Sequence, residues 1–362
     1  MGPGRAFCLS LATRHSPLAT LGVFVLALVL SATAWADEIV LIPGSKIPGP
    51  GGRVRGQIQS ESPSEVVIQL GGKDQTVPAD QIDSIRYDGQ PPSMSLAESR
   101  ESAGLLAEAA ELYKKAASEA QDKPLILQAA QYHQAKALAD LALADPEGAT
   151  EAVRLLEAFL KAHPKGRQLA PALESLARLQ LQKGDFAAAE RATAQMAGLP
   201  RGANRAAVLR ARVFAKRGEH QKAVAELDRI ISGSAGDKLR ASEARLAKAE
   251  SLAGLKKFRE AEAEARTVID ASPPEDFAAK SAAHNTLGDC LRAAGKPKDA
   301  LFEYLHTDLL YSKDKEQHPR ALAQIAQLFR EMKRDDRANE VMERLKQEYP
   351  RSPWLSASRT SP

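Results

Sequence analysis

The feature that most constrains the fold is a set of small residues that recurs at fixed offsets through the second half of the chain. Five windows share it, and they begin at Ala170, Asn204, Ser242, Ser281 and Pro319. The eighth position is always small, as Ala177, Ala211, Ala249, Gly288 and Ala326. The twentieth is always alanine, as Ala189, Ala223, Ala261, Ala300 and Ala338. Two antiparallel helices approach closely only where each presents a small side chain. The spacing therefore predicts a ladder of helix pairs whose contacts these ten residues form.

Other positions of the windows agree with this prediction. Four windows have an apolar, aromatic or ring residue at position 17, just before the expected second helix, namely Phe186, His220, Phe258 and Pro297. Position 15 of the same windows holds Gly184, Gly218, Lys256 and Gly295. Larger residues at position 24, Leu227, Tyr304 and Met342, are expected to fill the gaps that remain. Prolines near the ends of two windows, Pro273 and Pro350, are expected to stop the second helix.

This spacing resembles the tetratricopeptide repeat, a helix-turn-helix unit with small residues at positions 8 and 20 and a proline near its end. Two less regular units precede the five windows, at residues 96–113 and 132–164. The resemblance implies a mainly α fold, an α-solenoid of about seven antiparallel helix pairs over residues 90–354, with a disordered tail at 355–362. An irregular helical bundle with chance alanine spacing is the alternative.

The first 36 residues have the pattern of a signal peptide. Arg5 and Arg14 precede an apolar run at residues 21–30, and Ala36 closes a small-aromatic-small triplet before Asp37. A run of ten apolar residues is short for a membrane span. We expect cleavage after Ala36 and an exported, periplasmic protein. The alternative is an uncleaved inner-membrane anchor at residues 18–34.

Residues 37–89 follow a different period, typical of short β-strands. Strands are expected at 39–42, 53–59, 65–70, 75–78 and 82–87, separated by Gly, Pro and Ser turns. The order of these segments resembles a small Sm-like or SH3-like β-barrel. The residues that carry the resemblance are Gly52, Val54, Gly56, Ile58, Val66, Ile68, Leu70, Val77, Pro78, Ile82 and Ile85. Sm-like barrels often bind RNA, but Arg53, Arg55 and Arg86 are few for a basic face, so a folding or docking module is expected.

Composition and charge give little support to nucleic-acid binding. The net charge is +4, and the two leader arginines leave 4 − 2 = +2 for the remainder. No dense stripe of Lys and Arg interleaved with aromatic residues is present, so no nucleic-acid partner is expected.

The sequence shows no pattern typical of a catalytic centre. The seven histidines are scattered without metal-ligand spacing, and no phosphate-binding loop or nucleophile elbow is present. Cys290 is the only cysteine beyond the leader and is expected in the core. We therefore predict no enzyme activity, no metal and no cofactor.

The concave surface of such a solenoid is lined by the first helix of each pair. Positions 2, 5, 9 and 12 of the windows should face it, which nominates Arg178, Arg205, Arg212, Glu250, Asn285, Asp289, Arg320 and Gln327 as partner-binding residues. The alternative for each is a solvated helix face. The carboxy end around Pro350 resembles the closing repeat of bacterial envelope proteins, with Trp354 as a cap or a partner anchor.

These observations predict a non-enzymatic scaffold that binds a peptide or helix of an envelope protein in the concave surface. The alternative is a structural subunit of an envelope or cell-wall assembly complex that acts through its outer faces.

Overall fold

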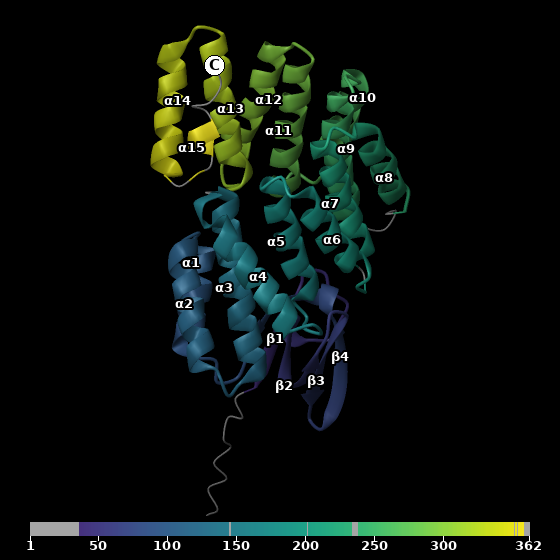
Figure 1. Ribbon diagram of the computed structural model, residues 1–362, viewed down its shortest axis with the longest axis vertical. Coiled ribbons are helices and arrows are strands. Elements are labelled where there is room, and N and C mark those ends of the chain that lie inside the picture. The colour runs from purple at the N-terminus through teal and green to yellow at the C-terminus, as the bar shows by residue number, and fades with distance from the viewer. Residues whose placement is uncertain are drawn as a thin grey trace, which may run out of the picture. The chain divides into compact units, whose positions relative to one another are not determined.

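The computed structural model describes residues 36–144, 146–200, 202–233, 238–350, 352 and 354–357. The expected leader and its cleavage signal lie almost wholly outside these residues, as does most of the expected carboxy-terminal tail. The described chain is mainly helical, and a small antiparallel sheet precedes the helices (Figure 1). This architecture confirms the predicted fold class. In the described part of the chain, no helix combines the length and the apolar character that a membrane span needs.

The sheet contains five strands in the order β4-β3-β2-β1-β5. Their bounds are β1 Asp37–Leu41, β2 Arg53–Glu61, β3 Glu65–Leu70, β4 Lys73–Pro78 and β5 Ile82–Arg86. Each expected strand overlaps one of them. All pairings are antiparallel, and among the described residues the edge strands β4 and β5 do not pair with each other. The sheet is therefore open at this edge, and the expected closed barrel is not confirmed.

The inner face of the sheet and the first helices share one hydrophobic core. Ile39, Val66 and Ile68 are fully buried and belong to the same cluster as Met94 and Tyr113 of the helices that follow. Burial of apolar surface on this scale is the main force that holds two such layers together. The sheet therefore packs on the start of the helical array.

The helices form seven successive pairs in the described chain, ending in the short α15. Their bounds are α1 Pro92–Ser102, α2 Leu106–Glu119, α3 Pro124–Ala144, α4 Ala149–Ala162, α5 Leu169–Gln182, α6 Phe186–Ala197, α7 Ala203–Lys216, α8 His220–Gly233, α9 Lys238–Gly254, α10 Phe258–Ala271, α11 Phe277–Ala293, α12 Pro297–Leu310, α13 Gln317–Glu331, α14 Asp335–Glu348 and α15 Trp354–Ala357. Short 3₁₀ turns occur at Pro50–Gly52, Ala79–Gln81 and Pro146–Gly148.

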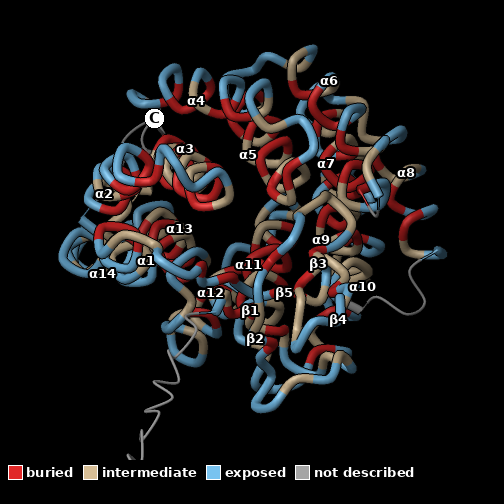
Figure 2. Tube along the Cα trace, turned by 90° about the horizontal axis from the view of Figure 1, so that it is seen from below, coloured by how far each residue is buried: buried red, intermediate tan, exposed pale blue. Residues whose placement is uncertain are grey.

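The first helix of each pair forms an inner layer, and the second forms an outer one. From α3 to α13, each first helix packs on the first helix of the next pair, in addition to its own partner. Buried residues gather where the helices face one another, and exposed residues cover their outer sides (Figure 2). The inner layer is therefore the surface that the solenoid presents as its concave side.

The turn inside each of the last five pairs uses a left-handed residue at position 15 of the window. Gly184, Gly218 and Gly295 have φ between +74° and +79°, whereas Lys256 and Lys333 adopt φ of +60° and +58°. Only glycine takes this conformation without a steric penalty from Cβ. The residues at position 17 were expected just before the second helix. They are instead its first residues, as Phe186 is in α6.

The ten small residues predicted at positions 8 and 20 are all buried. This is expected where the two helices of a pair pack against each other. The contact at Gly288 is tight, since an added Cβ would lie 2.7 Å from the Tyr304 ring. Tyr304 is itself fully buried and donates a hydrogen bond to Asp289 Oδ1 at 2.6 Å. A glycine in the middle of α11 thus makes room for the largest side chain at position 24.

Candidate protein-binding groove

The inner layer encloses a groove of about 1560 Å³. Its walls come from the α1–α2 turn, the inner faces of α3, α5 and α7, the α12–α13 loop, α13, the end of α14 and Trp354. These elements belong to the first four helix pairs and the last two, which are far apart in the sequence. A concave site of this size, with both apolar and polar walls, is large enough for several side chains of a bound segment.

The charged side chains of the groove are mixed in sign, with an excess of cations. Six are basic, Lys136, Arg178, Arg205, Lys313, Lys315 and Arg320, and four are acidic, Asp140, Glu174, Glu316 and Glu348. This distribution gives the walls a net charge of 6 − 4 = +2. A ligand segment with one or two more acidic than basic residues would match it.

Several of these cations are already neutralised by the protein. Lys136 Nζ lies 2.9 Å from Glu101 and 2.8 Å from Asp140, and Arg205 Nε lies 3.1 Å from Glu174. Arg178, by contrast, is half-buried and makes no ion pair with any described residue. Lys313 and Lys315 likewise make no ion pair with a described residue, but both are exposed, so Arg178 is the unpaired groove cation that is half-buried in the wall.

Apolar and ring side chains line the spaces between these charges. They include Tyr132, Leu143, Pro171, Tyr349 and Trp354. Trp354 also packs against the last buried cluster, which contains Leu322 and Leu345, and the Arg320 guanidinium lies 6.0 Å from its ring centre. Trp354 therefore covers the end of the solenoid and forms part of the groove wall at once.

Of the eight residues predicted to bind a partner, the structure brings three into the groove wall. These are Arg178, Arg205 and Arg320. Arg212 and Glu250 are exposed but are not among the groove residues. Asp289 is half-buried and is held by Tyr304 and Arg320, and Gln327 accepts a hydrogen bond from Arg292 Nη1 at 3.0 Å.

The placement of Asn285 differs from the prediction. Its side chain is fully buried, and Nδ2 donates to the Gln317 backbone oxygen at 2.9 Å. Position 5 of this window lies against the first turn of the next inner helix, so neighbouring repeats cover it. Asn285 therefore joins α11 to the start of α13 and does not face a ligand.

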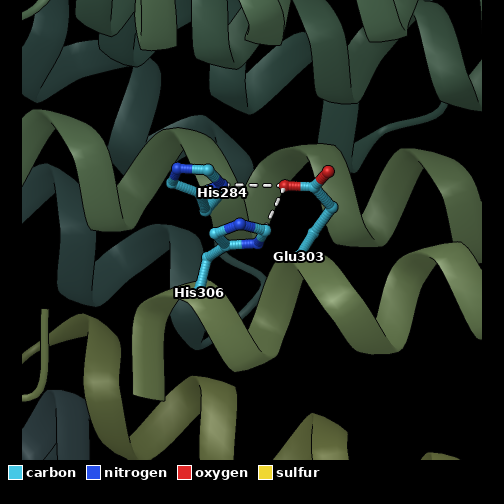
Figure 3. Close-up of side chains that lie close together, drawn as sticks. All are labelled: His284, Glu303 and His306. Atoms are coloured by element: carbon cyan, nitrogen blue, oxygen red, sulfur yellow. Dashed lines mark hydrogen bonds and ion pairs between the residues drawn. The ribbon is translucent and has the colours of Figure 1, made fainter. Parts of the chain in front are cut away.

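The histidines are scattered along the sequence, but the structure brings two of them together with a glutamate. His284, Glu303 and His306 lie together on α11 and α12, with a donor atom of each within 4.8 Å of the others (Figure 3). The signal in the sequence is the Glu-x-x-His spacing of residues 303 and 306, which places two donors on one helix face. The third donor comes from the partner helix, so spacing along the chain did not reveal it.

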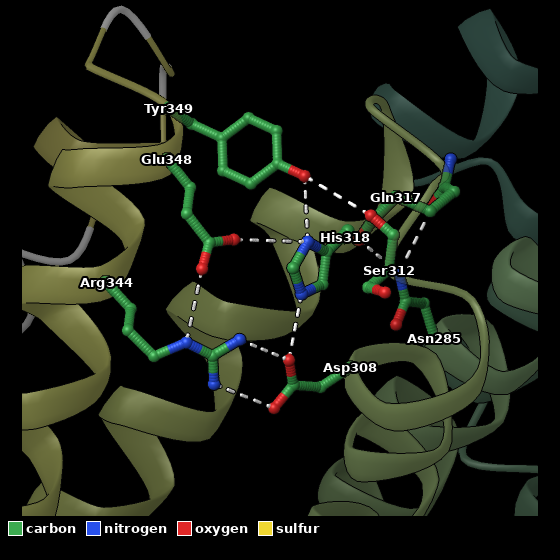
Figure 4. A network of polar contacts seen from close by, with 8 residues as sticks. All are labelled: Asn285, Asp308, Ser312, Gln317, His318, Arg344, Glu348 and Tyr349. Atoms are coloured by element: carbon green, nitrogen blue, oxygen red, sulfur yellow. Dashed lines mark hydrogen bonds and ion pairs between the residues drawn. The ribbon is translucent and has the colours of Figure 1, made fainter.

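A network of polar contacts behind the groove fixes its C-terminal wall (Figure 4). His318 is buried, its Nε2 lies 2.8 Å from Asp308 Oδ1, and its Nδ1 lies 2.8 Å from the Tyr349 hydroxyl. Arg344 Nη2 donates to the same Asp308 oxygen at 2.7 Å. These contacts join α12, α13 and α14, and thus position Tyr349 in the wall.

The same network resembles a catalytic relay, because a carboxylate, an imidazole and a hydroxyl contact one another in that order. The pKa of the hydroxyl opposes such a role. Burial and the nearby Glu348 carboxylate raise the pKa of Tyr349. A nucleophile needs its hydroxyl activated, which means a lowered pKa or a base free to take the proton. The arrangement acts as a brace between three helices.

Comparisons with known proteins agree with the helical-repeat fold. The family model described as tetratricopeptide repeat matches residues 174–238 and 241–306. A tetratricopeptide repeat protein from Parabacteroides merdae superposes with a TM-score of 0.50 at 16% identity, covering 74% of this chain and 98% of that one. A Rap protein complexed with Competence and Sporulation Factor superposes with a TM-score of 0.50 at 12% identity, covering 72% and 76%.

No curated protein matches the chain in sequence. Residues 174–238 and 241–306 therefore match the tetratricopeptide repeat, and the described helices form a solenoid that a small antiparallel sheet precedes.

Proposed function

We propose that this protein is an exported, non-enzymatic scaffold that holds a segment of a partner protein in the groove of its inner layer. The observation that carries the proposal is the groove itself, which has a cationic surplus and an arginine, Arg178, without an ion-pair partner among the described residues. A solenoid binds through a long, preorganised surface, so several weak contacts add up without a deep pocket.

The walls define the chemistry of the segment. The Arg178 guanidinium would bind a carboxylate of the segment, because paired hydrogen bonds from a guanidinium to a carboxylate are among the strongest polar contacts in proteins. Tyr132, Leu143 and Pro171 would take apolar side chains of the same segment. An extended or helical segment that alternates acidic and apolar residues fits both requirements.

A related fold offers a parallel. The Rap protein that superposes on this chain was solved complexed with Competence and Sporulation Factor, so a solenoid of this kind can hold a ligand. Export rests on the leader pattern in the sequence, and the envelope setting rests on the resemblance of the carboxy end to envelope proteins.

Crosslinking in living cells tests the proposal. A photoreactive residue at Ser175, an uncharged groove residue beside Arg178, should capture one envelope protein, whereas the same residue at the exposed Glu340 of outer helix α14 should not. The Arg178→Glu substitution should abolish the Ser175 crosslink, since it places a carboxylate where the ligand's own is expected. Equal capture from both positions, or capture unaffected by Arg178→Glu, would contradict groove binding.

A second candidate function is favoured by a separate observation. Phe302, Leu309 and Leu310 of the outer helix α12 are 63%, 74% and 58% exposed, and their spacing places them on one helix face. Exposed apolar side chains in a group often mark a contact surface. This face suits the alternative of a structural subunit that assembles through its outer helices, and crosslinks from Leu309 rather than Ser175 would favour that function.

A further inference from the structure

His284 of α11 and Glu303 and His306 of α12 bring two imidazoles and a carboxylate together between the helices of one pair (Figure 3). His284 Nδ1 lies 2.8 Å from Glu303 Oε2, and His306 Nδ1 lies 4.0 Å from the same oxygen. All three side chains therefore meet around one carboxylate oxygen. This is a compact set of donor atoms between α11 and α12, and none of the three residues belongs to the groove.

The charge balance of the cluster sets it apart from the other carboxylates of the outer helices. Glu226, Glu262 and Glu264 are 13% to 15% exposed, and each pairs with lysine or arginine. Glu303 is 15% exposed too, but among the described residues its ion-pair partners are only the two histidines. An imidazole, unlike a lysine or arginine side chain, does not carry a permanent positive charge. The Glu303 carboxylate thus lacks a permanent positive partner.

Neighbouring groups restrict the His284 and Glu303 side chains, whereas the more exposed His306 side chain can rotate. His284 lies between the rings of His306, at 4.8 Å, and Tyr311, at 5.7 Å, and is nearly parallel to the first. His306 is 47% exposed, and its Nδ1 lies 2.8 Å from the Phe302 carbonyl oxygen. A ring N–H that donates to a backbone carbonyl fixes the tautomer and leaves Nε2 with a free lone pair, as is usual for metal-binding histidines.

We propose that His284, Glu303 and His306 form a binding site for a divalent transition-metal ion of the zinc type. Two imidazole nitrogens and one carboxylate oxygen are a ligand set that suits zinc, and the ion supplies the positive charge that Glu303 lacks. Metal–nitrogen bonds of about 2.0–2.1 Å place tetrahedral ligand atoms roughly 3.3 Å apart. His284 Nδ1 and Glu303 Oε2 would open from 2.8 Å to about this spacing, and rotation of the exposed His306 would bring its Nε2 towards them.

Three protein ligands leave one coordination position open to water or to a group from another molecule. Binding would tie α12 to α11 at mid-helix, because the ligands come from both. The ion would therefore stabilise the helix pair against unfolding, in addition to any chemistry at the open position.

The test uses the full chain, free of any affinity tag, titrated with Zn²⁺ by calorimetry and with Co²⁺ by visible absorption. The decisive variant is His306→Ala, since this half-exposed residue is removed at little cost to the fold. Glu303→Gln keeps the shape of the side chain and removes the charge. The matched control is His133→Ala, because His133 also contacts a glutamate, Glu101, but Lys136 occupies the place of the second histidine.

The proposal predicts one strong Zn²⁺ equivalent for the wild-type chain and for His133→Ala. His306→Ala and Glu303→Gln should each weaken binding by at least about tenfold. Zn²⁺ should raise the melting temperature of the wild type and not that of His306→Ala. A wild-type chain that takes up no Zn²⁺ or Co²⁺, or a His306→Ala variant that binds as tightly as the wild type, would overturn the proposal.

Discussion

Replacing Gly288 with alanine should destabilise the protein, although the same change inside a helix is ordinarily favourable. Alanine in a helix interior is worth about 1 kcal/mol over glycine. At Gly288 the new Cβ would lie 2.7, 2.8 and 3.0 Å from three atoms of the Tyr304 ring, well inside the roughly 3.5–4.0 Å at which carbon atoms attract. The ring is fully buried and hydrogen-bonded to Asp289, so it has no free direction in which to move.

The magnitude follows from these two opposing effects. Overpacking a close-packed core costs about 1–3 kcal/mol, and the gain in helix propensity returns up to about 1 kcal/mol. Because three ring atoms lie within 3.0 Å, the cost should be at the upper end of this range, and Gly288→Ala should lower the free energy of unfolding by about 2 kcal/mol. Urea denaturation followed by circular dichroism measures this change. The control is Gly233→Ala at the end of α8, where no atom lies within 4 Å of the added Cβ and stability should change little.

A second substitution tests the steric explanation itself. In an earlier repeat the equivalent positions are Ala211 and Leu227, which are buried in one cluster. Gly288→Ala combined with Tyr304→Leu reproduces that pairing. The double variant should be more stable than the sum of the two single effects predicts, by about 1 kcal/mol or more. A Gly288→Ala variant as stable as the wild type, or a strictly additive cycle, would refute the reasoning.

Three further predictions concern the turns, the polar network and the lone cysteine. Lys333→Gly should raise the free energy of unfolding by about 0.5–1 kcal/mol, because Lys333 is exposed and holds φ at +58°; an unchanged or lower urea midpoint would contradict this. Although burial opposes it, hydrogen bonds from His318 and Arg344 hold the pKa of Asp308 at about 2, so this carboxylate should contribute about 2 kcal/mol above pH 4 that is lost as the pH falls towards 2. Asp308→Asn should be less stable at pH 7 and lack that part of the acid dependence, and parallel urea-midpoint profiles for both proteins would count against the network. Burial raises the pKa of Cys290 to about 12, so a thiol reagent should modify it only after unfolding, and rapid labelling of the native chain would show that it is accessible.

The sequence predicted the repeating part of the structure well, because that part depends on local chemistry. Small residues at positions 8 and 20 sit where helices cross, and residues such as Gly184 sit where the turn needs a positive φ. A short-range pattern of this kind is visible in the chain without knowledge of the fold. The expected strands were found for the same reason, but whether the sheet closes depends on pairing between its edges, which the alternation of residues does not encode.

The candidate sites could be predicted only in part. Arg178, Arg205 and Arg320 were placed on the inner layer by position alone, and the structure puts them in the groove wall. Asn285 has a comparable position but is covered by the next repeat. Whether an inner position faces a ligand or a neighbour depends on how far one repeat is rotated against the next.

What the sequence determined by itself is the unit of the architecture, a helix pair with a tight turn and a small-residue contact. Helical periodicity, turn conformation and close packing act within some forty residues, so one unit carries the information. The tertiary structure alone decided which surfaces the stacked units share. It brought Lys313 of the α12–α13 loop and Tyr132 of α3 into one groove, and it joined His284 to Glu303 and His306 across a helix pair. These contacts connect residues distant in the chain, and their geometry is set by small rotations between repeats that accumulate along the solenoid.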